Sequence, residues 1–438
     1  MEFSFEKPAH LPECGSVPSI VQPAAPRAIA LDLAPLEVAA RLRHLPGLVF
    51  FDTAKDDCDP AALSVVAAAP REILRGNIAH DWDHFRAALA ACERSSGADD
   101  GLPHGFAAGR IDYDGTFCFG LYDEVLLYRH AEQRWYATGN LASQQEKKST
   151  RMRLAPSPPP ASCTRPQFRP RMEPHHFREM VRRAQEYIAA GDIYQVNLSH
   201  RFTSPWSGEP WAFYEALRNY SPAPHAAFLD LGGSAVLSTS PECFLKMSGR
   251  AIRTRPIKGT RPRKADPLAD EKSAFDLITS AKEIAELVMI TDLERNDLGQ
   301  VCDFGSVAVP ELLKLERHEQ VFHLVSTVGG RLRDGVDHES ALRACFPGGS
   351  ITGAPKKRAR EIIAELEPCP RGLYTGALGW FGFNGESQFS IAIRTVVVEG
   401  GEAHFDVGAG IVADSSPEAE WQETLDKAAG ILLASERL

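Results

Sequence analysis

Apolar residues recur at a spacing of three and four after Pro174, which is typical of a helix that buries one face. The positions in this row are Phe177, Met180, Val181, Ala184, Tyr187 and Ile188. Gly191 ends the pattern, and the chain then alternates between apolar and polar residues over 193–199. The sequence therefore predicts a helix followed by a strand.

The same two periods predict elements along most of the chain. Helical patterns occupy 35–45, 267–298, 357–367 and 416–436. Strand patterns occupy 120–128, 134–138, 389–398 and 403–407, and the last two flank a Gly-Gly turn that predicts a hairpin. The helices and strands follow no regular βαβ order and no internal repeat, so the pattern favours an α+β fold.

Proline content divides the chain into four regions. Residues 1–28 are predicted to form a loosely ordered lead-in, and 29–145 form an N-terminal region of mixed elements. Residues 146–172 include Leu-Ala-Pro-Ser-Pro-Pro-Pro-Ala-Ser at 154–162, which predicts a stiff, extended connector. Residues 173–438 carry most of the motifs described below and form the predicted catalytic domain. A boundary in composition does not make the two large regions separate folding units.

Composition narrows the class of protein. The 438 residues are 44% apolar and 24% charged, with a formal net charge of −10, which argues against binding nucleic acid or an anionic membrane. No apolar run approaches the roughly 18–20 residues of a membrane-spanning helix. The first residues show no targeting pattern, and the nine cysteines include no CxxC pair. A cytoplasmic protein is expected.

One lysine is a candidate nucleophile. Lys258 lies in the string Arg-Pro-Ile-Lys-Gly-Thr-Arg-Pro at 255–262, with an arginine on each side. Neighbouring cations make an ammonium ion costly, so we expect this side chain to lose its proton readily. For this string alone, a solvated basic turn is the alternative.

Two helices each carry a pair of glutamates on one face. Glu283 and Glu286 are three residues apart, as are Glu420 and Glu423. Carboxylate oxygens are the ligands that Mg²⁺ prefers, and no His or Cys stands at metal-ligand spacing with them. Taken alone, each pair could equally be a solvated face of its helix.

The glycine-rich loop 346–356 leads directly into a helix, whose free N–H groups could bind an anion. It lacks the Gly-Lys-Ser/Thr of a nucleotide-binding loop, so it could also be a turn that only caps the helix. Arg394 is predicted on a strand face shared with Ser390, Ala392 and Val396, where a buried guanidinium needs a carboxylate partner.

Ten ordered motifs resemble those of chorismate-utilising enzymes. They are GDIYQVNLS (191–199), SPECFL (240–245), RPIKGTRPR (255–263), AELVMITDLERNDLG (285–299), HLVSTV (323–328), FPGGSITGAPKKRA (346–359), LYTGALGW (373–380), IAIRT (391–395), GAGIV (408–412) and EAEWQETLDKA (418–428). The resemblance is strong over 173–433 and weak over 29–139. It implies a two-lobed α+β fold in which large antiparallel sheets pack together with helices outside. The N-terminal region is then expected to complete the same core.

Two positions discriminate among members of this family. Members that activate water carry a lysine where this chain has Gln195, so water is not the expected nucleophile. Anthranilate synthases carry alanine at the position of Lys258. A lysine at this position resembles the pattern of the aminodeoxychorismate synthases. The resemblance thus implies chorismate amination for 4-aminobenzoate and folate synthesis. Anthranilate synthase component I and a non-catalytic, chorismate-binding regulatory subunit stay as alternatives.

The resemblance also implies roles in catalysis. Glu242 is expected to be the general acid and base that protonates the departing 4-hydroxyl, while Lys258 attacks C2 of the ring and forms a covalent adduct. Ammonia then displaces the lysine by attacking C4. A site that raises the pKa of Glu242 would assist the first step.

The remaining implied roles concern binding. Glu286 and Glu423 resemble ligands of Mg²⁺, and Glu283 and Glu420 are expected to act through water. The residues implied in binding substrate are Thr260, His323, Gly353, Tyr374, Arg394, Gly408, Gly410 and Lys427. His323 could instead be a satisfied core histidine. Glu294 and Asp297 are interpreted as structural.

The chain carries no glutaminase motif, so the resemblance implies a separate glutamine amidotransferase subunit as the donor of ammonia. One departure from the family pattern lies next to Glu242. Cys243 stands where the family usually has arginine, which could change the charge around the general acid.

Overall fold

The computed structural model describes residues 25–54, 59, 61–92, 101–139, 164–318 and 321–438. Most of the predicted lead-in and residues 146–163 of the predicted connector lie outside the described residues. Within residues 164–172, the short strand Arg169–Pro170 pairs with Gln195–Pro205, the first strand of the predicted catalytic domain.

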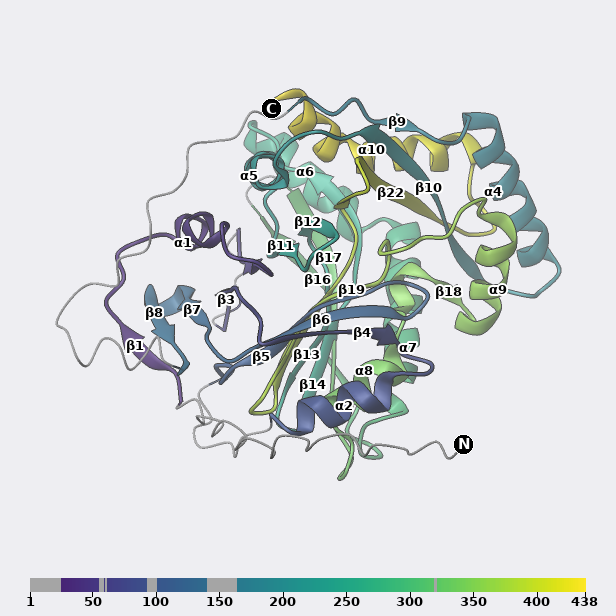
Figure 1. Ribbon diagram of the computed structural model, residues 1–438. Coiled ribbons are helices and arrows are strands. Elements are labelled where there is room, and N and C mark those ends of the chain that lie inside the picture. Colours follow the sequence, from purple (N-terminus) through teal and green to yellow (C-terminus); the bar gives the residue numbers. More distant parts are fainter. Residues whose placement is uncertain (1–24, 55–58, 60, 93–100, 140–163, 319–320) are drawn as a thin grey trace, which may run out of the picture.

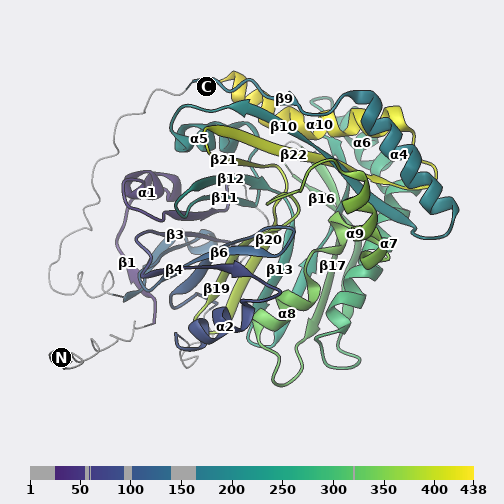
Figure 2. The same ribbon diagram turned by 45° about the vertical axis from the view of Figure 1, so that its right-hand side comes forward.

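Two antiparallel sheets form the body of the protein (Figures 1 and 2). The first has the order β1-β8-β7-β3-β2-β11-β12-β21-β22-β10-β18, with β9 also paired to β10. Its strands are β1 (Arg27–Ile29), β2 (Val49–Asp52), β3 (Leu63–Ala67), β7 (Leu126–Arg129), β8 (Arg134–Ala137), β9 (Arg169–Pro170), β10 (Gln195–Pro205), β11 (His225–Asp230), β12 (Ser234–Ser240), β18 (Gly353–Ala354), β21 (Thr395–Glu399) and β22 (Glu402–Ile411).

The second sheet has the order β15-β17-β14-β13-β20-β19-β5-β6-β4, with β16 also paired to β17. Its strands are β4 (Glu72–Asn77), β5 (Phe106–Ile111), β6 (Thr116–Tyr122), β13 (Cys243–Ser248), β14 (Ala251–Arg255), β15 (Ile257–Pro262), β16 (Ala308–Arg317), β17 (Val321–Arg331), β19 (Ala377–Gly382) and β20 (Glu386–Ile391). The predicted α+β fold with large antiparallel sheets is confirmed.

Helices cover the outer faces of the sheets. They are α1 (Pro35–Leu42), α2 (Trp82–Ala90), α4 (Pro174–Ala189), α5 (Pro210–Tyr220), α6 (Pro267–Ile278), α7 (Ala281–Gly299), α8 (His338–Cys345), α9 (Lys356–Leu366) and α10 (Pro417–Glu436), with the 3-10 turns η1 (His130–Glu132) and η2 (Gly349–Ile351). Figures 1 and 2 show α4 and α10 along β10 and β22, whereas α2 lies beside the second sheet.

One apolar core lies between the two sheets, and N-terminal strands contribute to it. Val49, Phe106 and Tyr122 are buried there with Ala227 of β11 and Trp380 of β19. β2 pairs with β11, and β5 pairs with β19, so the N-terminal region adds strands to both sheets. This confirms the expectation that it completes a shared core. Close packing of such a core makes the relative position of the sheets a fixed feature of the site.

The bounds of three predicted elements are wrong. In each case, the predicted single element is two separate elements in the structure. The strand predicted over 120–128 divides into β6 and β7, which belong to different sheets. The strand predicted over 389–398 divides into β20 and β21, again in different sheets, so Arg394 lies at the crossing rather than on a strand face. The helix predicted over 267–298 divides into α6 and α7, because the Ser280 hydroxyl accepts a hydrogen bond from the Glu283 N–H and begins a new helix.

Candidate functional site

Two segments that cross between the sheets lie side by side at the centre of the site. Glu242 lies on the crossing from β12 to β13, and Arg394 lies on the crossing from β20 to β21. The Ile391 N–H donates to the Glu242 carbonyl at 3.1 Å, and the Thr239 N–H donates to the Arg394 carbonyl at 3.1 Å. Arg394 has a φ of 50°, a backbone conformation that residues with a side chain rarely adopt. The fold holds such strain where neighbouring structure over-determines it, which is common at functional sites.

The η2 turn joins Lys258 to Glu242. The Lys258 Nζ donates to the Ser350 carbonyl at 3.0 Å. The Glu242 carboxyl group accepts hydrogen bonds from the Ser350 hydroxyl and from the Ile257 N–H. Burial raises the pKa of Glu242, and the Lys258 charge only partly opposes this effect. A raised pKa is the property expected of a general acid at neutral pH.

The predicted reason for the reactivity of Lys258 is wrong, because its surroundings are acidic. Arg255 forms an ion pair with Glu316, and Arg261 lies 3.4 Å from Glu283. Each flanking arginine is therefore neutralised by a carboxylate that the sequence pattern does not reveal. The charge of Lys258 in turn acts on the buried carboxylates around it, including Glu286.

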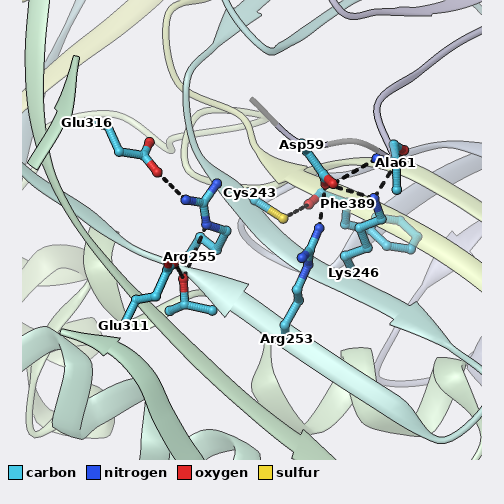
Figure 3. A network of polar contacts seen from close by, with 10 residues as sticks. Asp59, Ala61, Cys243, Lys246, Arg253, Arg255, Glu311, Glu316 and Phe389 are labelled. Carbon is cyan, nitrogen blue, oxygen red and sulfur yellow. Dashed lines mark hydrogen bonds and ion pairs between the residues drawn. The ribbon is translucent and has the colours of Figure 1, made fainter. Parts of the chain in front are cut away.

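Figure 3 shows the polar network around Cys243. The Cys243 Sγ lies 3.9 Å from the Phe389 carbonyl oxygen, so the thiol faces a neighbouring strand. Close by, Asp59 forms ion pairs with Lys246 and Arg253. Burial works against ionisation of Asp59, but the charge of Lys246 and a backbone hydrogen bond lower its pKa to about 2. Lys246 and Arg253 near Cys243 thus share one carboxylate partner.

The two acidic helix faces are brought together by a lysine. The Lys282 Nζ on α7 lies 3.9 Å from Glu286 and 3.5 Å from Glu420 on α10. Glu420 is only 2% exposed and accepts a hydrogen bond from the Ser415 hydroxyl at 2.7 Å. The alternative of a solvated helix face is therefore wrong for Glu420, whereas the Glu423 side chain is 42% exposed and stays partly solvated.

The charges of two neighbouring glutamates act on Glu286. Burial raises the pKa of Glu286, and the like charges of Glu283 and Glu423 add to the effect. Burial also works against ionisation of Glu423, but its ion pair with Lys427 at 2.7 Å lowers its pKa. Carboxylates that repel one another at a buried site are a natural location for a cation.

Glu286 and Glu423 fit Mg²⁺ better than a metal that needs an all-protein cage. Among the described residues, no three His, Cys, Asp or Glu side chains are placed to hold a metal ion together. Mg²⁺ commonly binds through one or two carboxylates and completes its shell with water and substrate oxygens. The Glu420 Oε2 is buried and, within the described part of the chain, lacks a hydrogen-bond partner, as expected of an oxygen that awaits a water or cation.

A cavity of ≈ 100 Å³ opens beside the crossing segments. Arg394 and His323 both line it, together with Pro241, Cys243 and Ile257. Within the described residues, no carboxylate lies within ion-pair distance of Arg394, and burial lowers the pKa of its guanidinium. A buried guanidinium without a protein carboxylate is suited to an anionic ligand. His323 faces the cavity and hydrogen bonds through Nδ1 to the Thr260 hydroxyl at 2.9 Å.

Most of the remaining predicted site residues lie where side chains pack closely against the backbone of a glycine. A Cβ on Gly408 would lie 2.8 Å from the Tyr374 hydroxyl, and one on Gly410 would lie 2.4 Å from the Gln195 amide nitrogen. Gly353 has a φ of 145° and lies against the Gln195 carbonyl. Lys427 donates to the Gly408 carbonyl at 2.9 Å, which connects α10 to β22. Only glycine allows these side chains to approach the strand so closely.

Three residues of the site were missed or undervalued from the sequence. Ser350 binds both Lys258 and Glu242, and Lys282 joins the acidic helices. Glu294, interpreted as structural, is buried within hydrogen-bond distance of the η2 turn. A signal was present for Glu294, since an acid on the apolar face of α7 with Leu287, Thr291 and Leu298 is unusual. No sequence signal distinguishes Ser350 from other loop serines.

Comparisons with known proteins agree with this arrangement. A family model described as "chorismate binding enzyme" matches residues 76–433. Anthranilate synthase component 1 of Streptomyces coelicolor is 51% identical over 262 residues, which cover 60% of this chain and about half (51%) of that relative. Aminodeoxychorismate synthase component 1 is 42% identical in Bacillus subtilis, covering 71% of this chain and 68% of the relative, and 44% identical in Escherichia coli, covering 73% and 70%.

Solved structures show the same fold. Anthranilate synthase component I from Streptococcus pneumoniae superposes with a TM-score of 0.75 at 28% identity, over 85% of this chain and 92% of that chain. The menaquinone-specific isochorismate synthase from Escherichia coli superposes with a TM-score of 0.74 at 20% identity, over 95% and 96%, which is evidence for the fold alone. Among the described residues, no helix is both long and apolar enough to cross a membrane.

Proposed function

Because this chain belongs to the chorismate-binding enzyme family, we propose that it takes chorismate as its substrate and aminates it, as an aminodeoxychorismate synthase component 1 does. The observation that carries the amination is the arrangement of Lys258 and Glu242. A half-buried amine and a carboxyl group with a raised pKa are bound to the same residue, Ser350. A nucleophile beside an acid of this kind is the arrangement that covalent substitution requires.

In the proposed first step, the Lys258 side chain reacts as the uncharged amine, after its ammonium form has released a proton to solvent, and its nitrogen attacks C2 of chorismate. The ring double bonds shift, and the C4–O bond breaks as Glu242 gives its proton to the departing hydroxyl, which leaves as water. The proton of the attacking amine then passes to the Glu242 carboxylate, which restores the acid. The product of this step is a secondary amine between Lys258 and the ring.

In the second step, ammonia attacks C4, and the double bonds shift back. The C2–N bond to Lys258 breaks as Glu242 protonates the departing lysine nitrogen, and the excess proton on the new C4 amine then passes to the Glu242 carboxylate, which restores the acid. The sum of the two steps is chorismate plus ammonia giving 4-amino-4-deoxychorismate plus water, without oxidation or reduction. Dividing one difficult substitution into two easier ones is the usual advantage of covalent catalysis.

The other residues are proposed to bind and orient the substrate. Arg394, which lines the cavity, and Tyr374, whose hydroxyl lies close to Gly408, would hold the enolpyruvyl carboxylate together with the backbone near Gly408 and Gly410. Thr260, Gly353 and Lys427 would contact the ring carboxylate, and His323, which lines the cavity and hydrogen bonds to Thr260, would lie beside the ring. Glu286 and Glu423 would hold Mg²⁺, with Glu283 and Glu420 acting through water. Bound there, the ion would offset the charge of the ring carboxylate.

Ammonia is proposed to come from a separate glutamine amidotransferase subunit. The relatives in Bacillus subtilis and Escherichia coli are named component 1, which implies a second component in those proteins. The sequence of this chain contains no glutaminase motif of its own. Added ammonium is expected to replace the partner at higher concentration.

Anthranilate synthase activity is the second candidate, because the Streptomyces coelicolor relative shares 51% identity. Product analysis distinguishes the two functions. Incubation with chorismate, Mg²⁺ and ammonium should give 4-amino-4-deoxychorismate, detected by chromatography with mass detection, and no pyruvate. Anthranilate with equimolar pyruvate would establish the second candidate instead. Saturable binding of chorismate without any turnover would support a non-catalytic subunit.

The covalent step has its own test. Mass spectrometry after incubation with chorismate and Mg²⁺, without ammonium, should find the mass of chorismate less water on the peptide that contains Lys258. Lys264→Ala, a substitution on the adjacent loop, is the matched control and should keep the adduct. An enzyme that forms product while its Lys258 peptide stays unmodified under these conditions would contradict the covalent mechanism.

A further inference from the structure

Glu294 is a buried carboxyl group that the proposed chemical steps do not use. It lies on α7 and is 3% exposed. Its Oε1 accepts a hydrogen bond from the Gly349 N–H at 3.0 Å. Its Oε2 is also buried and, among the described residues, lacks a hydrogen-bond partner. A buried polar atom left in this state needs an explanation.

Gly349 is the first residue of η2, the turn that binds both proposed catalytic side chains. A Cβ at this position would lie 3.0 Å from the Glu294 Oε1 and 2.7 Å from a methyl group of Leu293, so α7 and the turn are in close contact. The next residue, Ser350, accepts from Lys258 through its carbonyl and donates to Glu242 through its hydroxyl. One hydrogen bond therefore separates Glu294 from the residue that holds Lys258 and Glu242.

The titratable groups around Glu294 come from four different elements. Asp297 of the same helix forms an ion pair with Lys356 of α9, Glu242 lies on the β12–β13 crossing, and the Cys345 thiol ends α8. Burial, followed by the charge of Asp297, raises the pKa of Glu294, and Glu242 adds to this although Lys356 opposes it. Lys356 is already paired with Asp297, so a neutral Glu294 leaves the cluster without excess charge.

We propose that Glu294 is a positioning residue for the reaction. Its carboxyl group holds the Gly349 N–H and thereby fixes the η2 turn, so that Ser350 presents the Lys258 nitrogen and the Glu242 carboxyl group to the same substrate. The reaction itself rests on the proposed function, whereas the effect of Glu294 on the turn does not. Displacements of about 1 Å in a catalytic group can cost about 10²-fold in rate, which makes a single anchoring bond important.

Four variants separate positioning from a contribution to folding. Glu294→Gln keeps an oxygen that can accept from Gly349 and stays neutral, as a protonated carboxyl group does. Glu294→Leu removes the acceptor at similar volume. Asp292→Asn changes an exposed acid on the same helix and is the matched control. Val38→Ala creates a cavity in α1, far along the chain from the site, and controls for lost stability.

The first measurement needs no substrate. Hydrogen–deuterium exchange of the peptide 346–353, followed by mass spectrometry, reports the opening of the η2 turn. We expect Glu294→Leu to increase the exchange rate of this peptide about tenfold or more, since the Gly349 N–H loses its acceptor. Glu294→Gln and Asp292→Asn should match the unmodified protein. Unchanged exchange in folded Glu294→Leu overturns the proposal, whatever reaction the protein catalyses.

The second measurement is the steady-state consumption of chorismate, which does not depend on which product forms. We expect Glu294→Leu to lower kcat about 10²-fold, with KM changed by less than about threefold, because substrate contacts lie on other elements. Glu294→Gln should restore kcat to within about threefold of the unmodified protein. Val38→Ala should lower the thermal midpoint while it leaves kcat unchanged. Equal kcat losses in Val38→Ala and Glu294→Leu at equal loss of stability would assign Glu294 a folding role only and overturn the proposal.

Discussion

The Lys282 ammonium on α7 lies 3.5 Å from the Glu420 carboxylate on α10, so one ion pair joins the two acidic helices. The same nitrogen lies 3.9 Å from Glu286. The Lys282 ammonium therefore lies between carboxylates of the two helices and supplies positive charge there, as a bound metal ion would. A cation that binds between these helices has to compete with Lys282.

Removing a proposed ligand should weaken the response to Mg²⁺. In Glu286→Gln, one charged oxygen donor is lost, and we expect the Mg²⁺ concentration for half-maximal chorismate turnover to rise about tenfold or more. Activity titrated with MgCl₂ after removal of metal by a chelator checks this prediction. Glu418→Gln, an exposed substitution at the start of α10, should leave the titration unchanged. A half-maximal concentration unchanged in Glu286→Gln would exclude this residue as a ligand.

Removing the competing lysine should act in the opposite direction. Lys282→Gln leaves Glu286 and Glu420 without their common cation, so the negative potential at the helices increases. We expect the half-maximal Mg²⁺ concentration to fall, and the fall should be larger at low ionic strength than at high ionic strength. The same titration at two KCl concentrations measures both effects. If Lys282→Gln and Glu286→Gln shift the midpoint in the same direction, the competition between lysine and metal is wrong.

Loss of the Arg394 guanidinium should affect binding more than chemistry. Its side chain lines the cavity, and a charge-assisted hydrogen bond to a carboxylate contributes about 1.5–3 kcal/mol, so Arg394→Ala should raise the KM for chorismate about 10- to 150-fold. Arg394→Lys keeps the charge but cannot form the bidentate contact, so its KM should lie between those of the unmodified protein and Arg394→Ala. Steady-state kinetics measure this series. Arg358→Lys, at a half-buried position of α9, is the control, and a purely kcat-based loss in Arg394→Ala would argue against carboxylate binding.

The chain changes from one sheet to the other within a predicted strand, which explains why the geometry of the site could not be predicted from the sequence. Residues 389–398 alternate as a single strand would, yet Arg394 takes a positive φ, and the chain changes sheets there. Phe389 and Ile391 pack into one apolar cluster, whereas Val396 and Val398 pack into another, so both sides of the crossing are buried but in different cores. Apolar residues therefore continue along the sequence through a break that depends on long-range packing. In contrast, the break between α6 and α7 has a local signal that the prediction missed, because Ser280 and Glu283 have the spacing of a capping box.

The environment of Lys258 shows the same limit for electrostatics. Two neighbouring arginines predicted a basic site, but Arg255 pairs with Glu316 on β16 and Arg261 with Glu283 on α7. Both acids are distant in the sequence, so charge patterns near Lys258 carry no information about them. The motif was enough to identify Lys258 as a candidate nucleophile. The charges around it depend on tertiary contacts, which the motif does not contain.

The pH dependence of turnover should reflect the burial of Glu242. Burial raises its pKa above the ordinary value of a glutamate, so the acid stays protonated to a higher pH. The proposed first step needs the protonated form, and kcat/KM should therefore fall as the pH rises above this pKa. Glu242→Gln should lose about 10²- to 10⁴-fold in kcat. The exposed Glu361→Gln controls for the substitution. Full activity in Glu242→Gln would assign the proton to another group.

Acidification should destabilise the fold through His404 on β22. Its side chain is buried, and burial, reinforced by the charges of Arg201, Arg110 and Arg171, lowers its pKa to about 4. In the unfolded chain, a histidine takes up its proton near pH 6.5, so protonation favours unfolding as the pH falls from 6.5 towards 4. At pH 5 the cost reaches about 2 kcal/mol. Above pH 7 the group is neutral in both states and adds no pH dependence.

His404→Gln isolates this contribution, because glutamine does not titrate. The substitution can lower stability at pH 7, but we expect the further loss between pH 7 and pH 5 to be smaller than in the unmodified protein by about 2 kcal/mol. Urea unfolding followed by tryptophan fluorescence at both pH values gives the two free-energy differences. The exposed His44→Gln is the matched control and should keep the full loss. Parallel pH dependence in His404→Gln and the unmodified protein would show that His404 is protonated in the folded state as readily as in the unfolded chain.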